Sequence, residues 1–130
     1  MLRSVSGVVV GYLVFAIPAI LLFRVTGRDP HAPATVAFAL LSIIFGTVVA
    51  FAGGYVAGVI GNKAPIWHSA AVGIVLALVA VLSMILQRGQ GALWTQVAAV
   101  LVMAPSAALG GFLRAAQVCR PTPNSSLQYR

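Results

Sequence analysis

The chain contains very few side chains that could carry out chemistry. Asp29 is the only acidic residue among 130, and it lies outside every long apolar run. Membrane segments use carboxylates to relay protons, to bind hard cations and to perform acid/base catalysis. Because the apolar runs contain none, we predict that this protein is not an enzyme and does not couple transport to protons or cations.

His68 is the strongest candidate for binding a ligand, because it lies at the start of the third apolar run. There its imidazole could ligate a metal porphyrin or chlorin, or titrate near neutral pH. The alternative is an interfacial histidine that bonds to a carbonyl or a lipid headgroup beside Lys63 and Trp67. His31 is expected on the other membrane face, and Cys119 is the only cysteine, so neither completes a metal site. We expect no cofactor and no metal, with haem or chlorin at His68 as an alternative.

The composition is that of a membrane protein. Hydrophobic residues make up 61% of the chain and the mean hydropathy is +1.04, whereas soluble domains are roughly 45–50% apolar. Four charge-free segments each reach the roughly 20 residues that cross a bilayer as a helix. We predict an all-α bundle of four antiparallel transmembrane helices within residues 1–113, with spans at about 4–23, 34–60, 65–87 and 91–113. The basic tail, 114–130, is polar and is expected to be poorly ordered by itself.

Two prolines lie inside the predicted spans. Pro18 and Pro105 remove the backbone donors that would serve the carbonyls of Val14 and Leu101, so a kink is expected at each. The connections between spans are short, and only 24–33 is long enough to have a shape of its own. In that loop we consider Arg24, Arg28, Asp29 and His31 as candidates for docking a partner, or for contacts confined to the loop.

Small residues recur at four-residue spacing in the spans. Lipid tails are as apolar as leucine, so helices associate through close backbone approach at such positions. We expect these ridges to pack helices within the chain, with a ridge reserved for another subunit as the alternative. The residues are Gly46, Ala50, Gly54 and Gly58 in the second span, Gly73 and Ala77 in the third, and Ala107, Gly111 and Ala115 in the fourth.

Two similar triplets raise the question of internal duplication. Gly53-Gly54-Tyr55 and Gly110-Gly111-Phe112 lie near the ends of the second and fourth spans. A duplicated two-helix unit would relate the halves by an axis along the membrane normal. Few other identities accompany the triplets, so an undivided four-helix unit is the other interpretation.

The net charge of +7 comes from eight basic residues spread over all connections and both ends. This distribution favours contact with anionic lipid headgroups over nucleic acid. Basic residues near the spans mark the cytoplasmic side. One side carries Arg3, Lys63, Arg114, Arg120 and Arg130, and the other carries Arg24, Arg28 and Arg88. Five against three favours both termini in the cytoplasm.

Several stretches together resemble an uncharacterised group of small four-span bacterial membrane proteins. They are Gly11-Tyr12-Leu13-Val14-Phe15, Thr26-Gly27-Arg28-Asp29-Pro30-His31-Ala32-Pro33, Gly53-Gly54-Tyr55-Val56-Ala57-Gly58 and Met103-Ala104-Pro105-Ser106-Ala107-Ala108-Leu109-Gly110-Gly111. The resemblance covers residues from about 7 to 115. It implies a location in the bacterial inner membrane and no particular activity.

Three functions remain in consideration. Small multidrug exporters need a glutamate in the first span, and fluoride channels need a pore asparagine, and both are missing here. We expect a small accessory or scaffold subunit that packs against other membrane-protein subunits, as in an energy-converting complex. A homo-oligomeric channel or transporter, with a path along Ser42, Thr47, Tyr55 and the carbonyls freed at the two kinks, is the first alternative. A pigment or haem carrier through His68 is the second.

Overall fold

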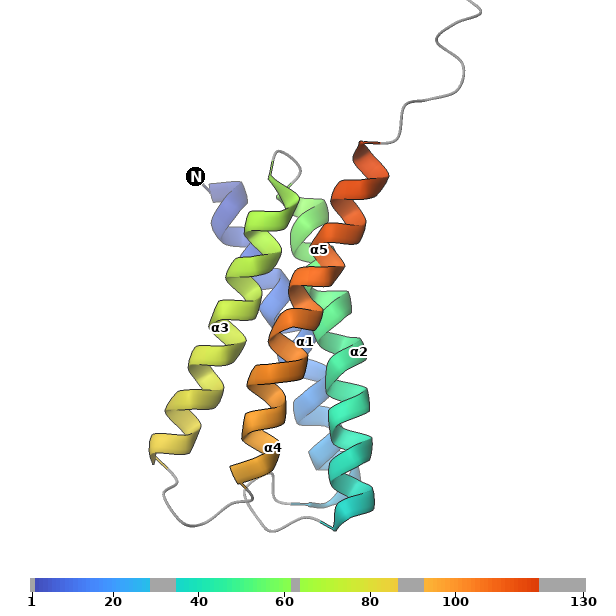
Figure 1. Cartoon of the computed structure of the whole chain (residues 1–130), viewed down its shortest axis with the longest axis vertical. Helices are drawn as coiled ribbons and strands as arrows, with labels where there is room; N and C mark the ends of the chain where they lie inside the picture. Colours follow the sequence, from blue (N-terminus) through green and yellow to red (C-terminus); the bar gives the residue numbers. More distant parts are fainter. Residues whose placement is uncertain (1, 29–34, 62–63, 87–92, 120–130) are drawn as a thin grey trace, which may run out of the picture.

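The computed structural model describes residues 2–28, 35–61, 64–86 and 93–119. They form four helices that are long and apolar enough to cross a membrane, packed against one another (Figure 1). The first three are α1 (Leu2–Thr26), α2 (Val36–Ile60) and α3 (Pro65–Leu86). The fourth consists of α4 (Leu93–Ala98), a π-helical segment η1 (Ala99–Met103) and α5 (Ala104–Val118). The predicted all-α architecture of four membrane-length helices is confirmed.

Two helices extend beyond the predicted spans. α1 continues past Arg24 to Thr26, and α5 continues past Arg114 to Val118. A charged residue ends the apolar stretch, but it does not end the backbone hydrogen bonding of a helix. The tail is therefore helical at its start, contrary to the expectation for 114–130, and the hydroxyl of Tyr55 fixes this turn by donating to Gln117 Oε1 at 2.9 Å.

The facing ends of α1 and α2 are both capped. Gly27 has φ +63°, and the Gly27 and Arg28 N–H groups donate to the carbonyls of Arg24 and Phe23. These two bonds are those of a Schellman motif, which favours glycine at the left-handed position. Thr35 begins α2 by accepting the Phe38 N–H on its hydroxyl, as an N-cap residue does.

The interruption expected at Pro105 takes the form of η1. In a π turn, a carbonyl pairs five residues ahead rather than four. The residue that must supply an N–H to the Leu101 carbonyl is then Ser106 instead of Pro105. α1, in contrast, stays helical through Pro18, and the kink expected there remains a prediction.

α2 and α3 are at the centre of the bundle. They contact each other, α1 packs against both, and α5 packs against both. Within the described residues, α1 makes no contact with α4, η1 or α5. The beginning of α1 and the end of α5 lie at the same end of the bundle (Figure 1). A two-fold duplication would require an α1–α5 contact equivalent to the α2–α3 contact, so this arrangement lacks the symmetry of a duplicated unit.

Glycines allow the backbones to approach closely at the centre. A Cβ atom on Gly54 of α2 would overlap the Ala107 carbonyl of α5, and one on Gly110 would overlap the Phe51 carbonyl of α2. On α3, a Cβ atom on Gly73 would lie 2.7 Å from the Ala104 carbonyl oxygen. The buried apolar core around these crossings is correspondingly small: Ala50, Ala57, Val72, Leu76, Met103 and Ala107.

Replacing Gly54 by alanine should therefore force α2 and α5 apart. Because the obstacle is backbone, which cannot rotate away, we expect a loss of about 1–3 kcal/mol in the free energy of unfolding. Gly7→Ala is the matched control, since its Cβ atom would lie 3.3 Å from the nearest atom, the Ala57 carbonyl oxygen. Reversible unfolding in mixed detergent micelles measures both variants. Equal stability of the two would contradict this account of the packing.

Candidate functional site

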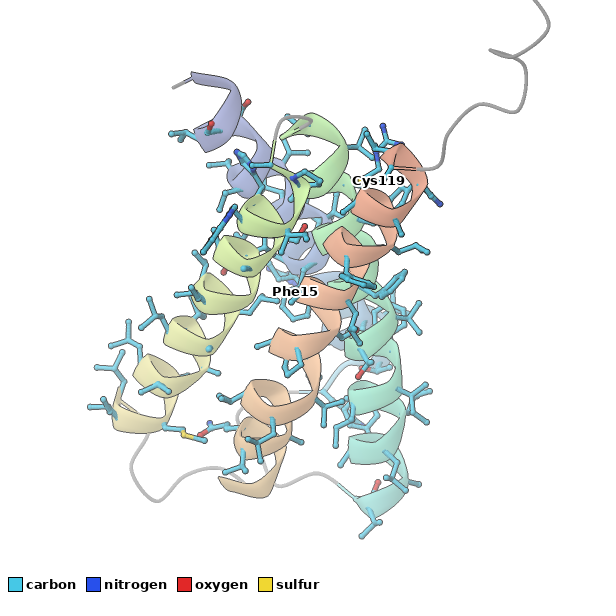
Figure 2. All side chains as sticks on the ribbon, turned by 45° about the horizontal axis from the view of Figure 1, so that its top comes forward. Phe15 and Cys119 are labelled. Atoms are coloured by element: carbon cyan, nitrogen blue, oxygen red, sulfur yellow. The ribbon has the colours of Figure 1, made fainter. Side chains whose placement is uncertain are left out.

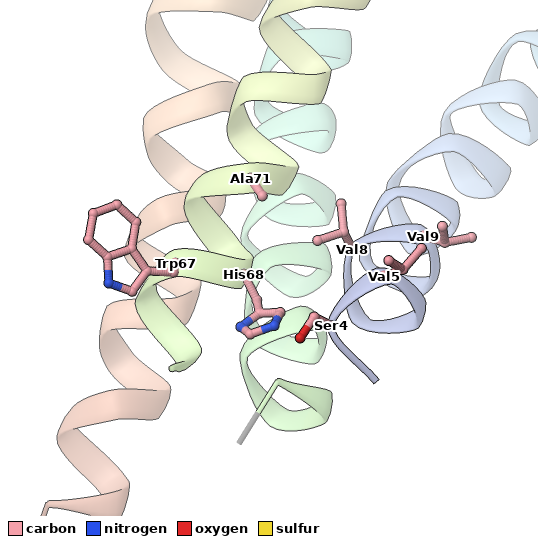
Figure 3. Close-up of a pocket in the computed structure, with 7 residues that line it drawn as sticks. All are labelled: Ser4, Val5, Val8, Val9, Trp67, His68 and Ala71. Atoms are coloured by element: carbon pink, nitrogen blue, oxygen red, sulfur yellow. The ribbon is translucent and has the colours of Figure 1, made fainter. Parts of the chain in front are cut away.

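An open groove lies between α1 and α3 at the end of the bundle where α1 begins. Its volume is about 430 Å³, within the range of small-molecule sites. α1 contributes residues spaced as on one helical face, and α3 contributes three more at similar spacing. The lining residues are Ser4, Val5, Val8, Val9, Trp67, His68 and Ala71 (Figure 3).

The groove opens because α1 and α3 diverge toward this end. At Gly11 the helices are close, and a Cβ atom there would lie 3.0 Å from a methyl group of Val72. One turn nearer the start of α1, the three atoms nearest to the Cβ position of Gly7 all belong to α2. α3 has thus moved away from α1, and the valines of α1 line the space between them.

Among the residues that line this groove, His68 has the side chain best suited to bind a ligand, through a ring nitrogen. Its Nδ1 is 2.8 Å from the Ala64 carbonyl oxygen. A carbonyl can only accept, so Nδ1 carries the proton, and in neutral imidazole Nε2 then keeps the lone pair. The Cγ, Nδ1 and Cδ2 atoms lie against Gly61, where any side chain would collide with the ring. Nε2 is consequently on the far edge of a ring whose position is fixed.

The surface of the groove is almost entirely apolar. The Ser4 hydroxyl points toward the His68 ring, while Val8 and Ala71 lie about one turn farther into the bundle (Figure 3). Trp67 lies at the rim, is 77% exposed and projects its indole away from Ser4. Among the described residues that line the groove, none carries a formal charge.

The remaining candidates near His68 and in the first loop are only partly placed. Lys63, Asp29 and His31 fall outside the described residues, so their predicted roles are untested. Arg24 is exposed. Arg28 lies over the ring of Phe38, 4.7 Å from its centroid, in a cation–π arrangement.

Phe38 also packs edge-on against Phe23, with their ring centroids 5.8 Å apart. Arg28 is therefore engaged by an aromatic pair at the facing ends of α1 and α2. A role for this arginine in docking a partner stays a prediction.

The predicted packing residues lie between the helices of this chain. Gly46, Ala50, Gly54, Gly58, Gly73, Ala107 and Gly111 are buried, and Ala77 and Ala115 are half-buried. Gly46 faces the Met103 side chain, and Gly58 faces Pro65, Ser69 and the Cβ atom of Arg114.

Hydroxyl groups join the central helices in a way that the sequence did not suggest. Ser69 is fully buried and directs its hydroxyl toward the Gly54 carbonyl of α2 at 2.7 Å and the Pro65 carbonyl of its own helix at 2.8 Å. Ser106 of α5 donates to the Thr47 carbonyl of α2 at 2.9 Å. Both serines belong to runs of small residues, where size rather than hydrogen bonding is the visible signal.

The hydroxyls proposed for a conduction path point elsewhere. Ser42 and Thr47 each donate to a carbonyl four residues earlier in α2, at 2.8 and 2.7 Å. Tyr55 bonds to Gln117. These three groups are thus paired within the bundle and do not form a continuous polar row.

The candidates for metal binding are sparse. No group of three histidine, cysteine or acidic residues comes together within the described ranges. Cys119 is exposed at the end of α5. His68 Nε2 is the atom that a haem iron or a chlorin magnesium would require, so that option remains a prediction that depends on one ligand.

Comparisons with known proteins supply no identity: no family model, no curated protein and no solved structure matches the chain.

Replacing Ser69 by alanine should weaken the α2–α3 junction. Hydrogen bonds between membrane helices contribute about 0.6 kcal/mol on average and at most about 1.7 kcal/mol, so a loss in this range is expected. Ser42→Ala is the matched control, because that hydroxyl bonds only within its own helix. Unfolding free energies in micelles compare the two variants. A Ser69→Ala protein as stable as Ser42→Ala would show that the bond contributes nothing.

Proposed function

We propose that this chain is a non-enzymatic accessory or scaffold subunit of a larger assembly in the bacterial inner membrane, for instance an energy-converting complex. The supporting observation is the second half of α3. No residue from Ala77 to Leu86 is buried, although a helix in a bundle ordinarily buries one face.

The exposed side chains of this segment lie on one side of the helix, and the residues on the opposite side are half-buried: Ala77, Ala80, Ser83 and Met84. Leu78, Leu82 and Ile85 are 62%, 55% and 54% exposed, and Val79, Val81 and Leu86 are exposed between them. η1 and α4 both contact α3, whereas other side chains of this part of α3 project away from the bundle (Figure 2). This outer side of α3 is exposed in the chain alone, and we assign it to a partner helix of another membrane protein.

The interior supports a structural role over a conducting one. Small residues close the central crossings, and the hydroxyls of Ser69 and Ser106 are bonded to backbone carbonyls. A transport path would need polar groups with free bonding capacity along a shared surface. The homo-oligomeric channel therefore remains the weaker proposal.

Photocrosslinking tests the partner surface directly. A diazirine amino acid at Leu82 in native membranes should give one discrete adduct with a different protein. Ile44, 63% exposed on α2, is the matched control and should react with lipid only. Absence of a protein adduct at Leu82, together with a lone monomer in mild detergent, would refute the accessory role. An adduct of twice the chain's mass would favour the homo-oligomer instead.

The proposed orientation places both termini in the cytoplasm. Cys119, the only cysteine, is exposed near the end of α5, so a membrane-impermeant maleimide should label it in inverted vesicles and not in intact spheroplasts. The matched control is Cys119→Ser with Val25→Cys, which moves the thiol to an 85% exposed position at the other end of the bundle. It should show the opposite pattern. Labelling of Cys119 from outside would reverse the orientation.

A further inference from the structure

We propose that Arg114 binds the phosphate of an anionic phospholipid where the ends of α2 and α5 meet the start of α3. These three helix ends lie together at one end of the bundle (Figure 1). The sequence favours anionic headgroups for the basic residues in general, whereas the structure gives this one arginine a defined position between helices. The site is formed by α2, α3 and α5 alone, so it does not depend on the accessory role.

The side chain of Arg114 begins where three helices meet. A Cβ atom on Gly58 of α2 would lie 3.3 Å from the Cβ atom of Pro65 in α3 and 3.4 Å from that of Arg114 in α5. The arginine is half-buried, and its Nε atom is buried without a hydrogen-bond partner. Because Nε is buried, the two terminal nitrogens of the guanidinium are the donors that can reach a ligand. A side chain held in this way loses little freedom on binding.

The positive charge of Arg114 has no acidic side chain of this chain to pair with. The only acidic residue, Asp29, belongs to the connection between α1 and α2, which joins the helix ends at the opposite end of the bundle. Residues 115–130 contain no acidic residue either. A partly buried cation without an anion is costly. An anion from outside the chain therefore stabilises this arginine.

The position of Arg114 along α5 matches the depth of lipid phosphates. Phe112 and Leu113 immediately precede it, and they are 61% and 43% exposed on a helix of membrane length. That helix ends one turn after Arg114, at Val118. Basic pockets between membrane helices bind anionic headgroups at this level. A free phosphate ion offers the same oxygens to the guanidinium, but it has no acyl chains to cover the neighbouring apolar side chains.

Gln117 provides a second donor one turn beyond Arg114. Its Oε1 atom accepts the hydroxyl of Tyr55 at 2.9 Å, which orients the amide and leaves Nε2 with two N–H donors. Residues three apart are neighbours on a helix surface, so one phosphate can accept bonds from both side chains. Neither side chain is a carboxylate that could pair with the ammonium of a zwitterionic headgroup. The site therefore favours phosphatidylglycerol over phosphatidylethanolamine.

Native mass spectrometry of the full chain in detergent measures this preference. Phosphatidylglycerol and phosphatidylethanolamine with the same acyl chains are added in equal amounts. A hydrogen bond to a charged group corresponds to about a tenfold difference in affinity, so the unaltered chain should retain phosphatidylglycerol about tenfold more. Arg114→Gln should abolish the preference. Arg24→Gln is the matched control, since it removes the same charge from an exposed arginine at the other end of the bundle, and it should leave the preference unchanged.

A second variant blocks the site while Arg114 stays in place. Gln117→Glu keeps an acceptor for the Tyr55 hydroxyl and adds a carboxylate one turn from the guanidinium. This carboxylate should pair with Arg114 and repel the phosphate, so the preference should again fall about tenfold. Because the packing of Arg114 against Gly58 is retained, an unfolded arginine variant cannot explain the same result here.

Several outcomes would overturn the proposal. Equal retention of the two lipids by the unaltered chain, or a preference that persists in Arg114→Gln or Gln117→Glu, would place no phosphate on Arg114. A preference that falls equally in Arg24→Gln would show general attraction between the basic chain and anionic lipid. Displacement of the lipid by millimolar inorganic phosphate would assign the arginine to a free anion.

Discussion

The whole bundle depends on the close backbone contacts of α2, which form at glycine residues. In a bilayer the hydrophobic effect does not drive helices together, because lipid covers apolar side chains as well as protein does. Close van der Waals packing contributes instead, and a gap of about 0.5–1 Å already loses a quarter to a half of the attraction between two atoms. Gly54 and Gly110 bring the backbones of α2 and α5 into contact at the carbonyls of Ala107 and Phe51.

Polar groups reinforce the same contacts. The hydroxyls of Ser69 and Ser106 reach carbonyls of α2 two turns apart, at Gly54 and Thr47. Such bonds need the close approach that the glycines allow, since a hydroxyl on a short side chain cannot bridge two ordinary helices. The interior is consequently tight, and its polar atoms are committed to holding the helices together.

Much of the architecture followed from the sequence. The charge-free runs predicted four spans because a bilayer-crossing helix requires only that one continuous segment be long enough and apolar enough. The small-residue spacing identified the faces that pack, since helical periodicity places those residues on one side. Neither pattern says which helix lies opposite, and the separation of α1 from α5 is therefore visible only in three dimensions.

The candidate site was predicted in part. His68 and Trp67 were identified because a histidine and a tryptophan near the end of an apolar run are distinctive. Ser4, Val5 and Val8 look like any lipid-facing residues, and only the divergence of α1 from α3 makes them the wall of a groove. The helices continue past Arg24 and Arg114, where the predicted spans end, because charge marks the limit of the hydrocarbon and not the limit of the helix.

The central position of α2 constrains the order in which the protein can be assembled. α2 enters the membrane second, but its tightest neighbour, α5, is synthesised last. Until the fourth span arrives, the glycine surface of α2 lacks its contact with Ala107, and the Thr47 carbonyl lacks the Ser106 hydroxyl. The last helix to be made is thus the one that completes the core, so a chain cut short after α3 would hold the correct spans without a closed centre, and a quality-control protease could distinguish the two.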